Sequence, residues 1–213
     1  MEAEPLARRY LDLLLGSDRH RASVLILDAV GAGMHVRDVY LKVFQPTQRE
    51  VGRLWQTNQI SVAQEHFCTA ATQLIMSQLY PHIFSTERNG HRMVASGSVG
   101  ELHELGIRMV ADFFELAGWD SCYLGANTPA ADLLRSVADQ QAEILALSAT
   151  ITYHVAALEQ VVRAVRATPG LERVRVLVGG NPFNAAPELW RQVGADGWAP
   201  DAGSAVILAE TLV

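Results

Sequence analysis

One short stretch of the sequence holds the residue types that a metal site or an acid–base site needs. In the sequence GELHELG, Glu101 precedes His103 by two positions and Gly106 follows it by three. A carboxylate that accepts a hydrogen bond from one imidazole nitrogen fixes the ring tautomer and leaves the other nitrogen for a metal. Gly106 permits the close approach of a bulky group. The stretch favours a metal-ligand role for His103, with a base or a hydrogen-bond partner as the other roles open to it.

The elements around this stretch predict where it lies in the fold. In the second half of the chain, short apolar segments alternate with amphipathic helical segments, and the last segment joins a short strand to a closing helix. This alternation predicts a doubly wound parallel sheet with helices on both faces, an α/β fold of the Rossmann-like type. Ligands of such sheets bind beyond the carboxyl ends of the strands. The predicted binding loops are therefore SGSVGELHELG, LGANTP, LSAT and VGGNPF. The first loop holds no GxGxxG or Walker sequence, which disfavours an ordinary dinucleotide or nucleoside triphosphate.

The first half of the chain has a different spacing of apolar residues. Apolar residues from position 5 to about 80 recur at helical spacing and predict four or five helices, which at this length usually form a bundle. Ser61 and Gln64 have the spacing of a capping box at a helix start. The polar stretch STERNGH separates the helical half of the chain from the half with alternating strands and helices. We predict a four-helix bundle at residues 1–88 and an α/β domain at residues 89–213.

Composition narrows the classes of partner. The formal net charge of the 213 residues is -6 and no run of Lys or Arg occurs, so direct binding to nucleic acid is not expected. No segment is apolar for the length of a membrane span, and the N-terminus lacks the pattern of a signal peptide. We therefore expect a cytoplasmic protein with no membrane partner. Cys68 and Cys122 match no metal spacing and are expected to be reduced thiols.

The strand-end loops resemble those of a known family. GELHELG resembles the D/E-x-H-x-x-G loop of cobalamin-binding domains, and two further motifs follow in chain order. Ser148 and Thr150 stand where that family has S-x-L or S-x-T, and Gly179–Gly180 stands at its glycine pair. The resemblance implies that His103 replaces the cofactor's own benzimidazole below the cobalt, and that the displaced tail occupies a slot lined by the small residues. Taken singly, the serine is also explained by a helix cap and the glycines by a turn.

A motif in the helical half resembles a narrower family. Trp55 is followed after nine residues by Glu65 and His66, and this W-x9-E-H arrangement resembles the CarH-type adenosylcobalamin photoreceptors. The resemblance implies that the bundle caps the upper face of the cofactor, with Trp55 against the adenosyl group and Glu65 and His66 positioning it. An aromatic ring offers a stacking face, and a carboxylate binds ribose hydroxyls. Without the downstream loop, Trp55 is better explained as a bundle-core residue and Glu65–His66 as an exposed pair; with the loop, a site is favoured.

The function implied by this resemblance is light sensing rather than catalysis. Light would remove the adenosyl group and change bundle packing, with signalling and transcription regulation through a protein partner or self-association. Gln56 follows Trp55 where well-known photoreceptors have a histidine, so water, His66 and His35 stay open as the ligand after illumination. The alternative function is a corrinoid methyl carrier serving methyltransferases, which the W-x9-E-H motif disfavours. A subunit of a radical mutase would need a catalytic barrel, which the sequence does not predict.

The expected cofactor is adenosylcobalamin, a cobalt corrinoid, bound base-off with a protein histidine below the metal. His103 is the predicted metal ligand, and no catalytic residue is expected. The predicted cofactor-binding residues are Trp55, Val62, Glu65, His66, Glu101, Leu102, His103, Glu104, Gly106, Ser148, Thr150, Gly179, Gly180 and Asn181.

Overall fold

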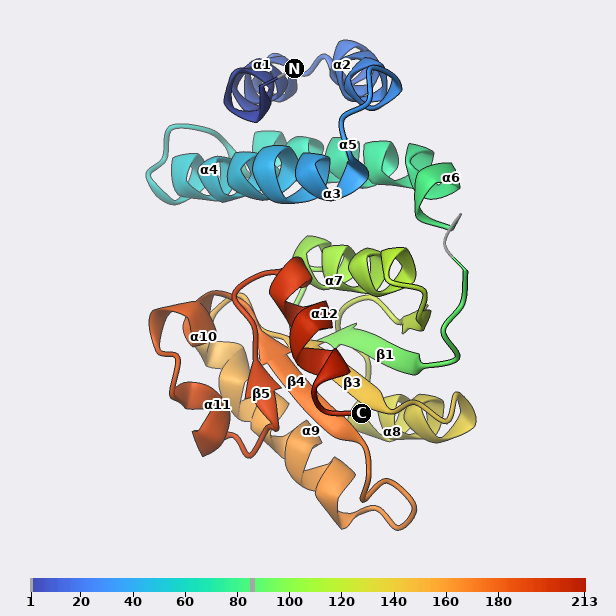
Figure 1. Cartoon of the computed structure of the whole chain (residues 1–213). Coiled ribbons are helices and arrows are strands. Elements are labelled where there is room, and N and C mark those ends of the chain that lie inside the picture. The colour runs from blue at the N-terminus through green and yellow to red at the C-terminus, as the bar shows by residue number, and fades with distance from the viewer. Residues whose placement is uncertain (1, 85–86) are drawn as a thin grey trace. The chain divides into compact units, whose positions relative to one another are not determined.

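The chain forms two compact units. A computed structural model describes residues 2–84 and 87–213, and the two units are Met1–Phe84 and Ser85–Val213 (Figure 1). The domain boundary predicted after residue 88 lies close to this division.

The N-terminal unit is a four-helix bundle with one short additional helix. The helical segments are α1 (Ala3–Leu15), α2 (Arg19–Gly31), α3 (Val36–Val39), the π-helical turn η1 (Tyr40–Phe44), α4 (Gln45–Gln56), α5 (Val62–Gln78) and α6 (Tyr80–Ile83). Because helical backbone continues through both junctions, α3, η1 and α4 form one long helix. This helix packs with α1, α2 and α5, as Figure 1 shows, and the predicted bundle is confirmed.

Local sequence explains where the bundle helices begin and how they pack. The predicted capping box is formed: the Gln64 backbone N–H donates to Ser61 Oγ at 3.2 Å, and the Ser61 N–H donates to Gln64 Oε1 at 3.0 Å. Inside the bundle, Tyr10 is fully buried and its hydroxyl lies 2.9 Å from Thr72 Oγ1. Gln48 Nε2 donates to the same Thr72 oxygen at 2.7 Å, so one polar cluster joins α1, α4 and α5.

The C-terminal unit is the predicted doubly wound sheet. Its strands are all parallel in the order β2-β1-β3-β4-β5: β1 (Arg92–Gly97), β2 (Asp120–Tyr123), β3 (Ile144–Ser148), β4 (Arg175–Gly179) and β5 (Gly197–Trp198). The helices are α7 (Leu105–Leu116), α8 (Ala130–Asp139), the 3-10 turn η2 (Thr152–His154), α9 (Val155–Ala167), α10 (Asn181–Ala185), α11 (Leu189–Gln192) and α12 (Ala202–Glu210). In Figure 1, α7 and α12 cover one face of the sheet, and α8 and α9 cover the other. The fold class expected from the sequence is confirmed.

The strand order decides where this unit binds ligands. From β1 the chain moves to β2 on one side of the sheet and then to β3 on the other, so the order reverses between β1 and β3. The carboxyl ends of two strands at such a switch point leave a crevice between their loops, which is the usual ligand site of these folds. The loop after β1 holds His103.

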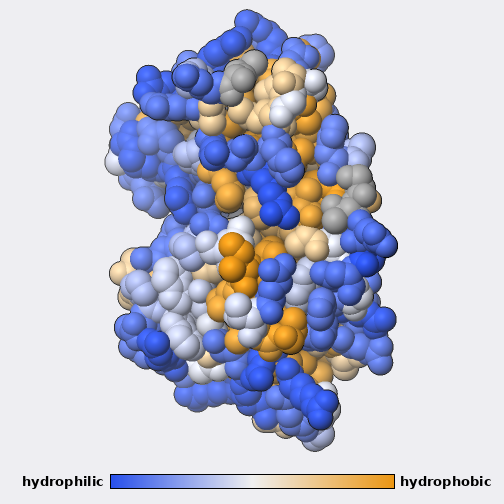
Figure 2. Space-filling model, in the orientation of Figure 1, coloured by the Kyte–Doolittle hydropathy of each residue, from blue (hydrophilic) through white to orange (hydrophobic). Residues whose placement is uncertain are grey.

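The surface of the C-terminal unit is mixed in polarity. Figure 2 shows apolar atoms gathered over α12, where Ile207 is an exposed side chain. Among the helices formed by residues 2–84 and 87–213, none combines the length and the apolar character that a membrane span requires.

Candidate functional site

The strand register brings the predicted loops to one edge of the sheet. Gly97 at the end of β1 pairs with Ser148 at the end of β3, which pairs in turn with Gly179 at the end of β4. Because all three strands are parallel, the chain leaves them in the same direction. The Ser98 N–H then donates to the Ser148 carbonyl at 2.9 Å, and the Gly100 N–H donates to Asn127 Oδ1 at 2.8 Å. The three predicted motifs therefore lie at the same edge of the sheet, and the first two of them flank the switch point.

A buried carboxylate holds the predicted metal ligand. Glu101 is fully buried, and its Oε1 accepts hydrogen bonds from the backbone N–H groups of Leu102 and His103, both at 3.0 Å. The same oxygen lies 2.5 Å from His103 Nδ1. An ionised carboxylate can only accept, so Nδ1 carries the proton and Nε2 is the ring nitrogen that a metal would take. The His103 side chain is 48% exposed, as a ligand reached from outside must be.

The second oxygen of Glu101 has partners of its own. The Thr150 N–H donates to Oε2 at 2.7 Å, and His154 Nδ1 lies 3.0 Å from it. Burial by itself raises the pKa of the Glu101 carboxyl, but the hydrogen bonds from His103, Thr150 and His154 outweigh burial. The pKa is held well below the ordinary range of a glutamate. The hydrogen bonds thus favour the ionised form of Glu101, which keeps His103 in one tautomer.

The glycines of the predicted site have different surroundings. Gly180 has a φ of +104°, and a Cβ at this position would lie 2.0 Å from the Ala149 carbonyl oxygen. Only glycine fits such a close approach of two backbones. A Cβ on Gly106 would meet nothing within 4 Å, so the first turn of α7 borders open space. Gly179 and Asn181 flank Gly180 at the end of β4 and the start of α10.

The donor set fits a cobalt that is already held by a corrin. Among residues 2–84 and 87–213, no group of three or more His, Cys, Asp or Glu side chains could hold a metal ion. A corrin supplies four nitrogen ligands of its own, so one imidazole with a fixed tautomer is sufficient as a protein ligand. His103 with Glu101 supplies that ligand, and Gly106 in the first turn of α7 borders open space.

Exposed apolar side chains lie in the loops that follow β1 and β3, and most of them were not predicted from the sequence. Leu102, which was predicted, is 80% exposed, and Tyr153 in the loop after β3 is 85% exposed. Val99 and Ile151 in the same two loops are also exposed. Large apolar side chains gathered on a surface mark a contact site for a partner or a ligand. The sequence signal for them was large apolar residues inside strand-end loops that are otherwise small or polar.

Glu104 forms a hydrogen bond within the C-terminal unit. It precedes α7, and the Tyr123 hydroxyl donates to its Oε2 at 3.3 Å. Burial and the neighbouring Glu104 carboxylate raise the pKa of Tyr123 above its ordinary value. This predicted contact residue therefore also ties the first loop to β2.

The predicted residues of the bundle gather at one end of their own unit. Trp55 lies near the end of α4, and Val62, Glu65 and His66 lie in the first turns of α5, directly after the short connecting loop. Trp55 is 39% exposed, which argues against the bundle-core role considered for it. Thr69 Oγ1 donates to Glu65 Oε1 at 3.1 Å, and His66 Nε2 lies 3.6 Å from Glu65 Oε2.

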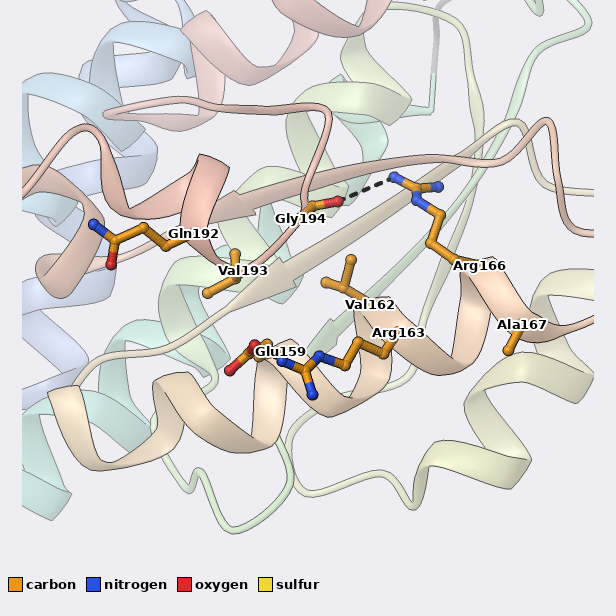
Figure 3. A pocket seen from close by; sticks show the side chains of 8 residues that line it. All are labelled: Glu159, Val162, Arg163, Arg166, Ala167, Gln192, Val193 and Gly194. Carbon is orange, nitrogen blue, oxygen red and sulfur yellow. Dashed lines mark hydrogen bonds and ion pairs between the residues drawn. The ribbon is translucent and has the colours of Figure 1, made fainter.

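A depression elsewhere on the C-terminal unit contains none of the predicted residues. It measures about 370 Å³ and lies between α9 and the end of α11, where Glu159, Arg163 and Val193 line it (Figure 3). Arg166, which also lines it, donates to the carbonyl of Val174 immediately before β4. The depression is thus at the amino edge of the sheet, opposite the loops that hold His103. Ligands of parallel sheets bind beyond the carboxyl ends of the strands, so this depression is not the candidate cofactor site.

Comparison with known proteins identifies the family. Residues 92–207, more than half of the chain, match the B12 binding domain family, and residues 6–80 match a second family that is also described as a B12 binding domain. The chain belongs to the B12-binding domain family. Both units of this B12-binding protein thus have a family match, and the corrinoid part of the expected cofactor is confirmed.

Relatives of this B12-binding protein are corrinoid proteins. It is 24% identical over 217 residues to dimethylamine corrinoid protein 2 of Methanosarcina acetivorans, covering 99% of this chain and 97% of that protein. It is 25% identical over 168 residues to a corrinoid protein of Desulfitobacterium hafniense, covering 76% of each. The monomethylamine corrinoid protein of Methanosarcina barkeri has the same fold, with a TM-score of 0.88, 19% identity and full coverage of both chains. The methanol:cobalamin methyltransferase complex MtaBC of the same organism matches at a TM-score of 0.52 and 17% identity, over 98% of this chain and 80% of that one.

These relatives overturn the expected function. The prediction of a CarH-type photoreceptor, with light sensing, signalling and transcription regulation, is wrong because the relatives are corrinoid proteins of methylamine systems by name. The error came from the W-x9-E-H motif. Trp55 and Glu65 lie close in sequence on either side of the α4–α5 loop, so their spacing follows from the bundle and does not specify an adenosyl group. The expectation of a binding protein rather than an enzyme agrees with the relatives.

Proposed function

We propose that this B12-binding protein is a corrinoid methyl carrier that presents its cofactor to methyltransferase partners. The observation that carries the proposal is the pair of His103 and Glu101 at the switch point, in a chain similar to a dimethylamine corrinoid protein over 99% of its length. When bound, the corrinoid supplies a cobalt centre that accepts a methyl group and gives it up again. The protein's own residues bind, orient and shield that centre.

Each residue of the C-terminal site has a role in this proposal. His103 would hold the cobalt through Nε2, and Glu101 holds the His103 ring. Ser148 and the glycine pair at the ends of β3 and β4 would line the slot for the displaced tail of the cofactor, with Gly180 packed against the Ala149 carbonyl. The exposed apolar residues, among them Leu102 and Tyr153, cover the apolar edge of the ring and exclude water from it.

The bundle contributes a second set of proposed contacts. Trp55, Val62, Glu65 and His66 lie together around the α4–α5 loop, and three of them are exposed. These four residues are proposed as cofactor contacts on the evidence of their sequence motif and of their clustering at this loop. The partner is a protein, in keeping with the methyltransferase complex among the structural relatives.

Spectroscopy of the loaded protein tests the site. The protein is reconstituted with aquocobinamide, a corrinoid that lacks the benzimidazole base, then freed of excess cofactor and reduced to the cobalt(II) state. A nitrogen ligand below cobalt(II) splits the electron paramagnetic resonance lines into triplets. We expect triplets from His103 in the wild type. In His103→Ala we expect their loss, together with a fall in cofactor retention of about 10- to 100-fold. Unchanged triplets in this variant would remove His103 from the site.

The choice of upper group tests the carrier function. A carrier of one carbon needs no adenosyl pocket, so methylcobalamin should be retained at least as well as adenosylcobalamin. After reduction, the loaded protein should take up a methyl group from methyl iodide and return it to a thiol. Retention of adenosylcobalamin alone, or a loaded protein that accepts no methyl group, would overturn the proposal.

A further inference from the structure

A second histidine shares the buried carboxylate of the site. His154 ends η2, immediately before α9, and its side chain is 11% exposed. Its Nδ1 lies 3.0 Å from Glu101 Oε2, whereas His103 contacts the other carboxylate oxygen. No sequence motif pointed to His154, which lies 53 positions after Glu101 and reaches it because β1 and β3 pair side by side.

The backbone and the ring of His154 are both held in place. Its carbonyl accepts a hydrogen bond from Ser98 Oγ at 3.1 Å, and its N–H donates to the Ile151 carbonyl at 3.1 Å. A Cβ built on Gly100 would lie 3.6 Å from His154 Nε2, so the ring packs against the first loop. The half of the site that follows β3 is thus locked to the half that follows β1.

Hydrogen bonds are what orient the Glu101 carboxylate. The last torsion of a glutamate side chain is broad and has no strong preference of its own. Oε1 is held by the Leu102 and His103 N–H groups and the His103 ring, and Oε2 is held by the Thr150 N–H and His154 Nδ1. Without His154, the Thr150 N–H is the remaining donor to Oε2, and the plane of the carboxylate is less firmly set toward His103.

We propose that His154 is a positioning residue for the lower ligand, acting through Glu101 on the tautomer and direction of the His103 ring. The inference rests on the proposed cofactor site. His154 is not itself offered as a ligand, because its ring is buried and packs against Gly100, whereas that of His103 is half exposed. Loss of a group that orients a metal-binding histidine typically weakens metal binding by about 10- to 100-fold.

The test compares variants by the nitrogen triplets of the cobalt(II) protein. His154→Ala should lower the ratio of histidine-bound to histidine-free cobalt by about ten-fold. His154→Asn should restore the wild-type spectrum, because its amide nitrogen lies near the position of Nδ1. His154→Gln should not restore it, because its amide nitrogen lies near the position of Nε2 instead. Thermal unfolding shows which variants are folded.

A second histidine–glutamate pair supplies the matched control. His91 Nδ1 lies 2.8 Å from Glu143 Oε2 at the amino edge of the same sheet, at the opposite end of β1 from the site. His91→Ala removes a contact of the same two residue types, although a more exposed one, and should leave the triplets unchanged. An effect of His91→Ala equal to that of His154→Ala would overturn the positioning role in favour of general destabilisation.

The remaining outcomes separate this inference from the proposed function. Wild-type triplets in folded His154→Ala, with triplets lost in His103→Ala, overturn the inference and leave the cofactor site standing. Triplets that persist in His103→Ala overturn the cofactor site itself. If His154→Ala does not fold, the Asn and Gln variants decide, and equal spectra from the two overturn the inference.

Discussion

At the scale of residues, a buried charge and two glycines with opposite surroundings define the site. Glu101 accepts five hydrogen bonds, three on Oε1 and two on Oε2, which compensate for the burial of its charge. Gly180 is pressed against the Ala149 carbonyl, whereas Gly106 faces open space. One glycine therefore serves the fold and the other leaves room for a ligand.

Substitution of each glycine by alanine separates these two roles. Gly180→Ala should lower the free energy of unfolding by about 3 kcal/mol, because a Cβ there meets backbone at a positive φ. Gly106→Ala should change it by less than about 1 kcal/mol, because α7 accepts alanine readily. It should instead weaken cobalamin retention by about ten-fold as the methyl enters the open space. Urea unfolding and gel filtration of the loaded proteins measure the two effects; equal stability of the two variants would contradict this assignment.

At the scale of elements, ordinary local rules build the helices that carry the site. The capping box at Ser61 begins α5, which holds Val62, Glu65 and His66 in its first turns. In the C-terminal unit, strand pairing positions the site residues, because it places the ends of β1, β3 and β4 in register. The helices and strands are thus regular, and the candidate site residues lie at or near their ends.

Removal of the cap should have a limited and measurable cost. Ser61→Ala should lower the free energy of unfolding by about 1 kcal/mol, because the Gln64 N–H loses its partner at the start of α5. Ser61→Asp is the control and should stay close to the wild type, because a carboxylate oxygen at the same position still accepts from that N–H. Equal losses in the two variants, measured by urea unfolding, would argue against the capping contribution.

At the scale of the whole molecule, two units with separate family matches make up one B12-binding protein. The N-terminal unit matches over residues 6–80 and the C-terminal unit over residues 92–207. The similarity to a dimethylamine corrinoid protein extends over 99% of the chain and so includes both units. The structure of the monomethylamine corrinoid protein likewise matches over the full length of this chain, and so over both units.

Binding of the cofactor should stabilise the molecule as a whole. A ligand that binds only the folded state at 100 times its dissociation constant adds about 2.7 kcal/mol of stability. We expect hydroxocobalamin at that excess to raise the melting temperature by roughly 8 °C. His103→Ala at the same concentration should show a smaller rise. A melting temperature that does not respond to excess cobalamin would contradict cofactor binding by the folded chain.

The parts that could be predicted from the sequence depend on short separations along the chain. Hydrophobic periodicity predicted the bundle and the alternating strands, because helix and strand repeats are local. The contact of Glu101 with His103 was predictable for the same reason, since two positions separate them. The W-x9-E-H spacing is also local, but it reports the geometry of a helix pair and misled the prediction of function.

The sequence by itself determined the element types, the parallel sheet and the ligand loop after the first strand, through patterns that adjacent residues carry. Only the tertiary structure decided that Ser148 and Gly179 join that loop in register, and that His154 reaches Glu101 from 53 positions away. The physical reason is that strand order and register depend on the packing of the whole sheet. A contact that exists only through β1–β3 pairing leaves no periodic or spaced signal in the chain.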